Sequence, residues 1–202
     1  LRGVVWDIDG TLADSFNLAF GATNRVLERN GVAPVDGQAY IDGCRFTTPV
    51  RLAQHAGFDA AVDSQRAAAL AAEFDADYIA LVTIEAAPLF PGVRDLLRDL
   101  ARHPSIKSGC LTNAAVGYAE AVVKVHSLED FVSVHGADDV PRAKPFADGL
   151  IVCASDLQLD PAECFYVGDS VTDGQAARAA EYGLAIGVCA RGVWISANDA
   201  TL

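Results

Sequence analysis

The sequence predicts an α/β fold: a parallel sheet covered by helices, with an all-helical insertion after the first strand. An apolar, β-branched run near the start of the chain indicates a buried strand. Residues 14–86 then show only helical patterns, and from Pro88 onward strand and helix patterns alternate. Such alternation is typical of parallel sheets with covering helices, so we expect the first strand to join the later ones.

The composition is that of an acidic globular chain. Of its 202 residues, 51% are hydrophobic and 21% are charged, enough for one large domain or a core with a smaller insertion. The net charge of −12 disfavours nucleic acid and anionic membranes as partners. No apolar run approaches the ~20 residues of a membrane span, and no secretory leader is visible. The five cysteines form no C-x-x-C pair, which favours free thiols, a cytoplasmic location and no zinc site.

Two aspartates, Asp7 and Asp9, follow the first apolar run, and Gly10 allows a sharp turn after them. In an extended strand these two side chains would point the same way. Such close charges raise each other's pKa unless a cation compensates. The pair therefore indicates either a bound metal ion or one aspartate that carries a proton. Either state suits nucleophilic attack combined with proton transfer. Asp-Gly is also common in ordinary turns, so other residues must decide between the two interpretations.

The helical insertion is predicted to contain three helices and a loop. The first begins near Phe16, with Asp14 or Ser15 as its cap, and ends at Asn30-Gly31. The remaining predictions are a loop over 40–46, a short helix over 48–56 and a long alanine-rich helix over 63–86.

The part of the chain after the insertion is predicted to alternate between helices and strands. The helices cover 93–101, 114–125, 145–157 and 172–180, and the strands cover 106–111, 131–134, 164–167 and 184–188. Pro145 suits the first turn of its helix.

Further polar side chains stand at the ends of these strands or the starts of these helices. They are Thr112, Asn113, Lys144, Asp169 and Asp173. Parallel strands end at one edge of a sheet, so these groups can converge on Asp7 and Asp9. Clustered carboxylates without His or Cys favour a hard divalent cation such as Mg²⁺. Each residue alone could be a helix cap, a surface charge or a helix-start acid. Their joint occurrence supports a site.

Four ordered motifs resemble those of the haloacid dehalogenase superfamily, closest to its phosphoglycolate-phosphatase-like subgroup. They are Asp7-Ile8-Asp9-Gly10-Thr11-Leu12, Leu111-Thr112-Asn113, Lys144-Pro145 and Gly168-Asp169-Ser170-Val171-Thr172-Asp173. The resemblance covers nearly the whole chain. It implies a Rossmann-like core over 1–13 and 87–202 and a helical cap over 14–86. The third motif departs from the family pattern, because Ala147 stands where relatives often have a second proline.

The resemblance implies a Mg²⁺-dependent phosphatase that acts on a small phosphorylated metabolite through an aspartyl-phosphate. Asp7 would be the nucleophile, Asp9 the general acid and base, and Lys144 would neutralise charge.

The ligand sets are likewise implied by the resemblance. Mg²⁺ would be held by Asp7, the Asp9 backbone carbonyl and Asp169, with Asp173 as a ligand or an outer partner. Thr112 and the Asn113 backbone would hold phosphoryl oxygens.

Other chemistries are weighed against this one. Dehalogenating relatives lack an acid at the position of Asp9, and the insertion has no lysine for Schiff-base chemistry. A β-phosphoglucomutase-like sugar-phosphate mutase and a non-catalytic phospho-accepting receiver-type module stay open as alternatives. Arg45 lies where relatives carry a specificity loop, and we expect it either to contact a substrate carboxylate or to be an exposed arginine. The natural substrate and the oligomeric state are not indicated.

Overall fold

The computed structural model describes residues 1–128, 130–189 and 192–196. The strands are β1 (Gly3–Trp6), β2 (Lys107–Leu111), β3 (Phe131–His135), β4 (Cys164–Gly168), β5 (Leu184–Cys189) and β6 (Gly192–Ser196). The helices are α1 (Phe16–Arg29), α2 (Gly37–Gly43), α3 (Thr48–His55), α4 (Ser64–Ala80), α5 (Val93–Ala101), α6 (Val116–Val125), α7 (Asp148–Asp156) and α8 (Val171–Ala179), with a 3-10 turn, η1 (Pro161–Glu163). None of the helices within the described residues has the length and apolar character needed to cross a membrane.

The sheet has the strand order β3-β2-β1-β4-β5-β6, and its first five strands in sequence are parallel. This confirms the predicted α/β fold with a helical segment between β1 and β2. β6 runs antiparallel to β5 and was not predicted, because the sequence prediction placed the last strand at 184–188. No helix pattern separates β6 from β5, so the alternation that revealed the other strands gave no signal there.

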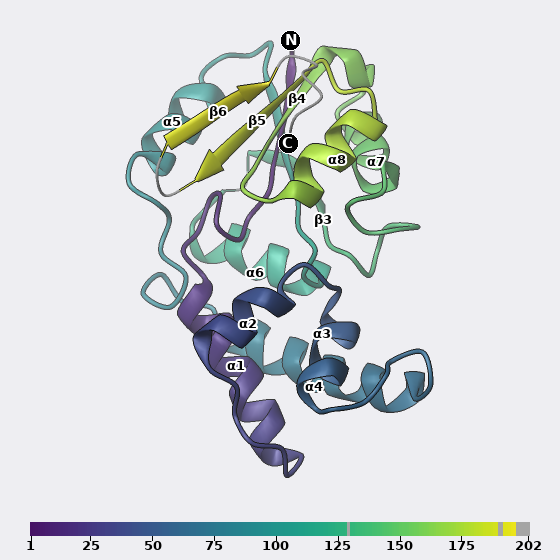
Figure 1. Ribbon diagram of the computed structural model, residues 1–202. Helices are drawn as coiled ribbons and strands as arrows, with labels where there is room; N and C mark the ends of the chain where they lie inside the picture. Colours follow the sequence, from purple (N-terminus) through teal and green to yellow (C-terminus); the bar gives the residue numbers. More distant parts are fainter. Residues whose placement is uncertain (129, 190–191, 197–202) are drawn as a thin grey trace.

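β1 lies at the centre of the sheet, and both of its faces are buried. Val4 and Trp6 belong to one hydrophobic core, which includes residues of α5 and α6. Val5 belongs to the second core, which includes residues of α7 and α8. Trp6 is in register with Cys110 on β2 and Val167 on β4, so the residues that follow these strands leave the sheet at one edge. In Figure 1 that edge faces the helical segment.

Helices α1 to α4 form this helical segment, which departs from the prediction at two places. Residues 40–46 were predicted as a loop, but α2 covers most of them, and Asp36 begins it by accepting a hydrogen bond from the Ala39 amide (2.8 Å). The terminal glycines of α2 hide the helical pattern. α4 ends at Ala80 and not at 86, since Thr83 instead accepts a local bond from the Ala86 amide (3.1 Å).

Two antiparallel stretches of chain join the helical segment to the sheet. The Asp14 amide donates to the Pro88 carbonyl (2.8 Å), and the Phe90 amide donates to the Leu12 carbonyl (3.0 Å). The segment therefore leaves and returns at one place, beside the carboxyl end of β1 (Figure 1).

The start of α7 also differs from the prediction. Pro145 was expected in the first helical turn, yet α7 begins at Asp148. Residues 143–146 form a turn instead, in which the Phe146 amide donates to the Ala143 carbonyl (3.1 Å). This turn lies outside the helix and carries Lys144 toward the carboxyl edge of the sheet.

Candidate active site

A cavity of about 450 Å³ lies between the carboxyl edge of the sheet and the helical segment. All the predicted site residues except Asp173 line it, namely Asp7, Asp9, Arg45, Thr112, Asn113, Lys144 and Asp169. Aromatic side chains from the helical segment, including Tyr40, Phe74 and Tyr78, line it as well. The cavity thus has a charged floor from the sheet and a largely aromatic roof.

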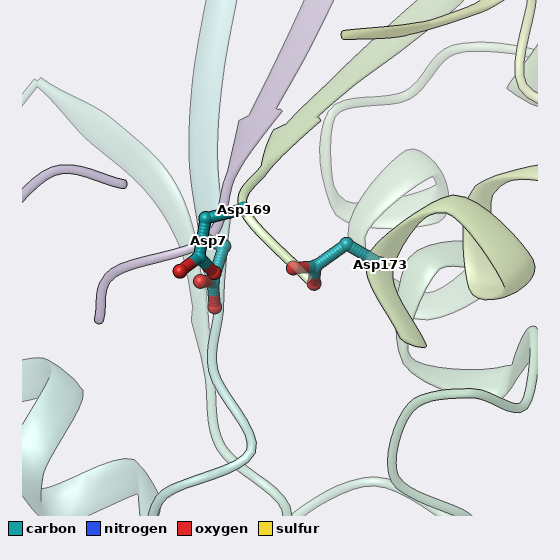
Figure 2. Close-up of side chains that lie close together, drawn as sticks. All are labelled: Asp7, Asp169 and Asp173. Carbon is teal, nitrogen blue, oxygen red and sulfur yellow. The ribbon is translucent and has the colours of Figure 1, made fainter. Parts of the chain in front are cut away.

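Three carboxyl groups meet at the floor. Oxygens of Asp7, Asp169 and Asp173 lie within 4.8 Å of one another, and Figure 2 shows the side chains converging from the ends of β1 and β4 and the start of α8. The convergence expected from a parallel sheet is therefore present. The side chain of Asp9 does not belong to this cluster.

Asp7 and Asp9 line the same cavity but contact different partners. β1 ends at Trp6, before either aspartate, so the two-residue alternation of a strand does not extend to them. Asp7 contacts Lys144 and accepts a bond from the Thr11 hydroxyl (3.3 Å), whereas Asp9 contacts a different set of hydroxyl groups.

The electrostatics of the carboxyl cluster favour a bound cation. Burial raises the pKa of Asp7 well above its usual range; Lys144 opposes this, and the Asp173 and Asp169 carboxylates add to it. Burial and then Asp173 raise the pKa of Asp169 to about 6. A divalent cation would relieve this repulsion, and a donor set made only of oxygen fits a hard ion such as Mg²⁺.

Lys144 pairs with two acids of the carboxyl cluster, and its side chain is only 3% exposed. Its Nζ donates to Asp7 Oδ1 (2.7 Å), Asp173 Oδ1 (2.6 Å) and the Leu111 carbonyl (3.2 Å). Burial lowers the pKa of Lys144, but the Asp173 and Asp7 carboxylates outweigh this and raise it above its usual value. The ammonium group therefore stays charged between two acids.

Asn113 positions Lys144 through its side chain. Its amide nitrogen donates to the Lys144 carbonyl and its amide oxygen accepts from the Lys144 backbone nitrogen, both at 3.0 Å. The sequence analysis gave a role only to the Asn113 backbone, so the contact between the Asn113 side chain and the Lys144 backbone was not predicted.

Asp173 is held by residues that the sequence analysis did not assign to the site. The Tyr166 hydroxyl donates to its Oδ1 (2.9 Å), and the Ser170 hydroxyl (2.6 Å) and amide (3.0 Å) donate to its Oδ2. Burial would raise the pKa of Asp173, but Lys144 and Ser170 hold it below its usual value. Tyr166 resembles any buried strand residue in sequence, whereas Ser170 is a recognisable helix cap.

Four hydroxyl groups surround the carboxylate of Asp9. Ser15, Tyr78 and Tyr118 donate to its Oδ1, the two tyrosines at 2.7 Å, and Thr112 donates to Oδ2 (3.0 Å). Tyr78 lies on α4 and Tyr118 on α6, and their rings stack with centroids 4.0 Å apart. Burial, and then the Asp9 charge, raise the pKa of both tyrosines well above the usual value, so both remain donors.

Two arginines of the helical segment line the cavity, and they differ in how far they are buried. Arg45 is exposed and its guanidinium lies 5.0 Å from the centre of the Phe46 ring. Arg51, on α3, is buried. The sequence analysis identified only Arg45, because a buried arginine cannot be distinguished from a surface one by helical spacing.

Comparison with known proteins agrees with this geometry. Residues 1–181 match the family described as haloacid dehalogenase-like hydrolase. A phosphoglycolate phosphatase of Caulobacter vibrioides is 32% identical, over 87% of this chain and 74% of that protein. An N-acetylmuramic acid 6-phosphate phosphatase of Pseudomonas aeruginosa is 28% identical, over 88% of this chain and 77% of that protein. The crystal structure of CbbY from Rhodobacter sphaeroides in complex with phosphate superposes with a TM-score of 0.77 at 23% identity, covering 90% of this chain and 84% of that one.

Proposed function

This chain belongs to the haloacid dehalogenase-like hydrolases and is a phosphatase of that family, and we propose that it hydrolyses a small phosphate monoester, phosphoglycolate-like or a sugar phosphate, through an aspartyl-phosphate on Asp7. The observation that carries the proposal is the position of Asp7 on the cavity floor, with Lys144 on one side and the Asp169 and Asp173 carboxylates nearby. Such a set of groups provides the positioning and the cationic stabilisation that phosphoryl transfer requires.

In the proposed reaction, an Asp7 carboxylate oxygen attacks phosphorus and the bond to the ester oxygen breaks. Asp9 acts here in its protonated form and gives its proton to the leaving alcohol. Water then attacks the phosphorus of the aspartyl-phosphate and Asp9 takes its proton, which releases phosphate and restores Asp7.

Asp7, the Asp9 backbone carbonyl and Asp169 would hold Mg²⁺, with Asp173 as a ligand or an outer partner. When bound, Mg²⁺ would supply positive charge to the phosphoryl oxygens and offset the repulsion among the carboxylates.

The other predicted residues have parts in the same proposal. Lys144 stabilises negative charge that develops on the transferred group. Thr112, whose hydroxyl would turn from Asp9 to the substrate, binds phosphoryl oxygens together with the Asn113 backbone. Arg45, at the exposed side of the cavity, is proposed to contact the leaving group. Residues 14–86 would act as a cap that excludes water from the core formed by 1–13 and 87–202, because their side chains roof the cavity.

The test is a phosphate-release assay with Mg²⁺ over small phosphate esters, comparing the wild-type protein with Asp7→Asn. We expect turnover only with a divalent cation present, and a loss of more than about 10³-fold in kcat for the variant. Release of phosphate by Asp7→Asn at the wild-type rate would refute the proposed nucleophile. A mutase would interconvert sugar phosphates without net phosphate release, and a receiver-type module would not turn over, so the assay separates both alternatives.

A further inference from the structure

Among the described residues, the Lys144 ammonium group faces four oxygen atoms, and one of them belongs to Tyr166, which has no part in the reaction above. Lys144 Nζ lies 2.7 Å from Asp7 Oδ1 and 2.6 Å from Asp173 Oδ1. It also lies 3.2 Å from the Leu111 carbonyl and 2.9 Å from the Tyr166 hydroxyl. An ammonium group carries only three N–H donors. One of the four oxygens therefore has no N–H of its own at any moment.

The Tyr166 hydroxyl differs from the other three oxygens because it can donate a hydrogen bond as well as accept one. It lies 2.9 Å from Asp173 Oδ1 and 3.3 Å from the Leu111 carbonyl, and Lys144 contacts both of these acceptors as well. Tyr166 is only 1% exposed, on the central part of the sheet where β4 pairs with β1. The hydroxyl and the ammonium group thus share two buried acceptors.

The protein without substrate does not need the Tyr166 hydroxyl as a donor. The three N–H groups of Lys144 suffice for Asp7, Asp173 and the Leu111 carbonyl. This changes when Lys144 turns one N–H to a phosphoryl oxygen, as the proposed reaction requires. One buried acceptor then loses its donor, and a buried acceptor without a donor is costly. The Tyr166 O–H can replace the missing N–H at Asp173 or at Leu111.

We propose that Tyr166 is a positioning residue that allows Lys144 to bind the phosphoryl group, because the Tyr166 hydroxyl takes over an acceptor that the ammonium group releases. This inference rests on the proposed function, in which Lys144 stabilises the transferred group. Only the direction of one O–H bond has to change, so the aromatic ring can stay in place. Tyr166 is not among the described residues that line the cavity, so it acts through Lys144 and not on the substrate.

The first test compares Tyr166→Phe with the matched control Tyr182→Phe. Tyr182 belongs to the same hydrophobic core, but its hydroxyl donates to the Leu150 carbonyl (2.7 Å), outside the site. Calorimetry with Mg²⁺ present measures the dissociation constant of inorganic phosphate. We expect Tyr166→Phe to weaken phosphate binding about 10-fold, as a buried acceptor without a donor implies. The kcat/KM for a phosphate ester should fall by a similar factor, and Tyr182→Phe should match wild type in both measurements.

Thermal melts separate positioning from packing. We expect the Tm of Tyr166→Phe to stay close to that of wild type, because Lys144 still serves its three other acceptors when no phosphate is bound. A lower Tm combined with wild-type phosphate affinity and kcat/KM would mean that the hydroxyl only supports packing, and would overturn the inference. Wild-type values in all three measurements would overturn it as well.

A double-mutant cycle tests whether Tyr166 acts through Lys144. In a Lys144→Met background, Tyr166→Phe should cause no further loss of phosphate affinity, because no N–H is left to turn toward the phosphoryl oxygen. A full, additive loss in the double variant would show that Tyr166 acts by another route, and would overturn the inference.

A measurement on the wild-type protein decides the matter even if Tyr166→Phe fails to fold. Protein labelled with ¹³C at the tyrosine Cζ reports the hydrogen bonds of each hydroxyl by NMR. Phosphate with Mg²⁺ should shift the Tyr166 signal and leave the Tyr182 signal in place. An unshifted Tyr166 signal at saturating phosphate would overturn the inference. Wild-type protein that binds phosphate but hydrolyses no ester would refute the proposed function, whereas the phosphate affinities would still test the role of Tyr166.

Discussion

At the scale of single residues, Asp9 is distinguished by its four hydroxyl partners. Tyr78 and Tyr118 donate to one of its oxygens from different elements, so the carboxylate is fixed beside the cavity. Hydrogen bonds to charged groups contribute about 1.5–3 kcal/mol each, which makes both tyrosines strong positioning residues.

We predict that Tyr118→Phe and Tyr78→Phe each lower kcat by roughly 10-fold with little change in KM, because a loosened Asp9 transfers its proton less efficiently. Steady-state kinetics measures this. Tyr182→Phe is the matched control, since Tyr182 is also buried but donates to the Leu150 carbonyl outside the site. A wild-type kcat in both site variants would show that these hydroxyls do not position the acid.

The sequence revealed the acids of the site, Lys144 and the pair Thr112 and Asn113, but not the tyrosines around Asp9. Asp7, Asp169 and Lys144 could be predicted to meet, because each follows a strand or precedes a helix of a parallel sheet. Tyr78 and Tyr118 could not, since a tyrosine at helical spacing resembles a core residue, and only the packing of α4 on α6 brings the two together.

At the scale of elements, the turn after β1 depends on Gly10. Its φ of +79° is a conformation that side chains disfavour, and an added Cβ would overlap the Asp169 carboxylate. Gly31 at the end of α1 has a similar φ of +72°, but nothing lies within 4 Å of an added Cβ there. The two glycines therefore separate backbone strain from disturbance of the carboxyl cluster.

We predict that Gly10→Ala and Gly31→Ala each lower the free energy of unfolding by about 1–2 kcal/mol, the cost of left-handed backbone for a residue with a Cβ. Only Gly10→Ala should raise the Mg²⁺ concentration that gives half-maximal activity. Denaturant titration and an activity titration with Mg²⁺ measure the two effects. An unchanged Mg²⁺ requirement in Gly10→Ala would contradict the placement of the metal at Asp169.

A second element-scale feature joins β3 to α7. Both ring nitrogens of His135 contact carboxylates at 2.7 Å, one of Asp139 and one of Asp156 at the end of α7. Burial lowers the pKa of His135, but its hydrogen bonds to Asp156 and Asp139 outweigh this and raise it above 6.5. The folded protein thus binds this proton more tightly than the unfolded chain does.

The stabilisation from His135 is therefore complete below pH 6.5 and disappears as the pH rises through the raised pKa. We predict that His135→Gln lowers Tm most near pH 5.5 and that its difference from wild type narrows toward pH 8. Thermal melts across this range test it, with the exposed His103→Gln as control. A difference in Tm that grows with pH would contradict the ion pairs.

Periodicity located most elements but failed where local hydrogen bonds or unusual composition dominate. The strands of the parallel sheet were found because apolar runs and helices alternate. α2 was missed, because its hydrogen-bonded start at Asp36 and its glycine ends give no helical stripe.

At the scale of the whole molecule, the sheet and the helical segment share one cavity, and two of the contacts between them bear on the site. One is the pair of backbone stretches that joins Asp14 to Pro88 and Leu12 to Phe90. The other is the stacked pair Tyr78–Tyr118, which brings a roof residue to Asp9. The position of the helical segment therefore affects Asp9 through its contact with Tyr78. The prediction of an inserted helical segment came from the sequence, but this contact between the two parts did not, because the two tyrosines are 40 residues apart in the chain and lie on different elements.

The most direct test of the account is to trap the phosphorylated residue. Asp9→Asn protein, mixed with Mg²⁺ and an aryl phosphate whose phenolate leaves without a proton from Asp9, and then quenched in acid, should accumulate the covalent intermediate because its hydrolysis lacks a base. Peptide mass mapping should then place one phosphoryl group on Asp7. Phosphate found on another residue, or full turnover without any phosphorylated peptide, would contradict the account.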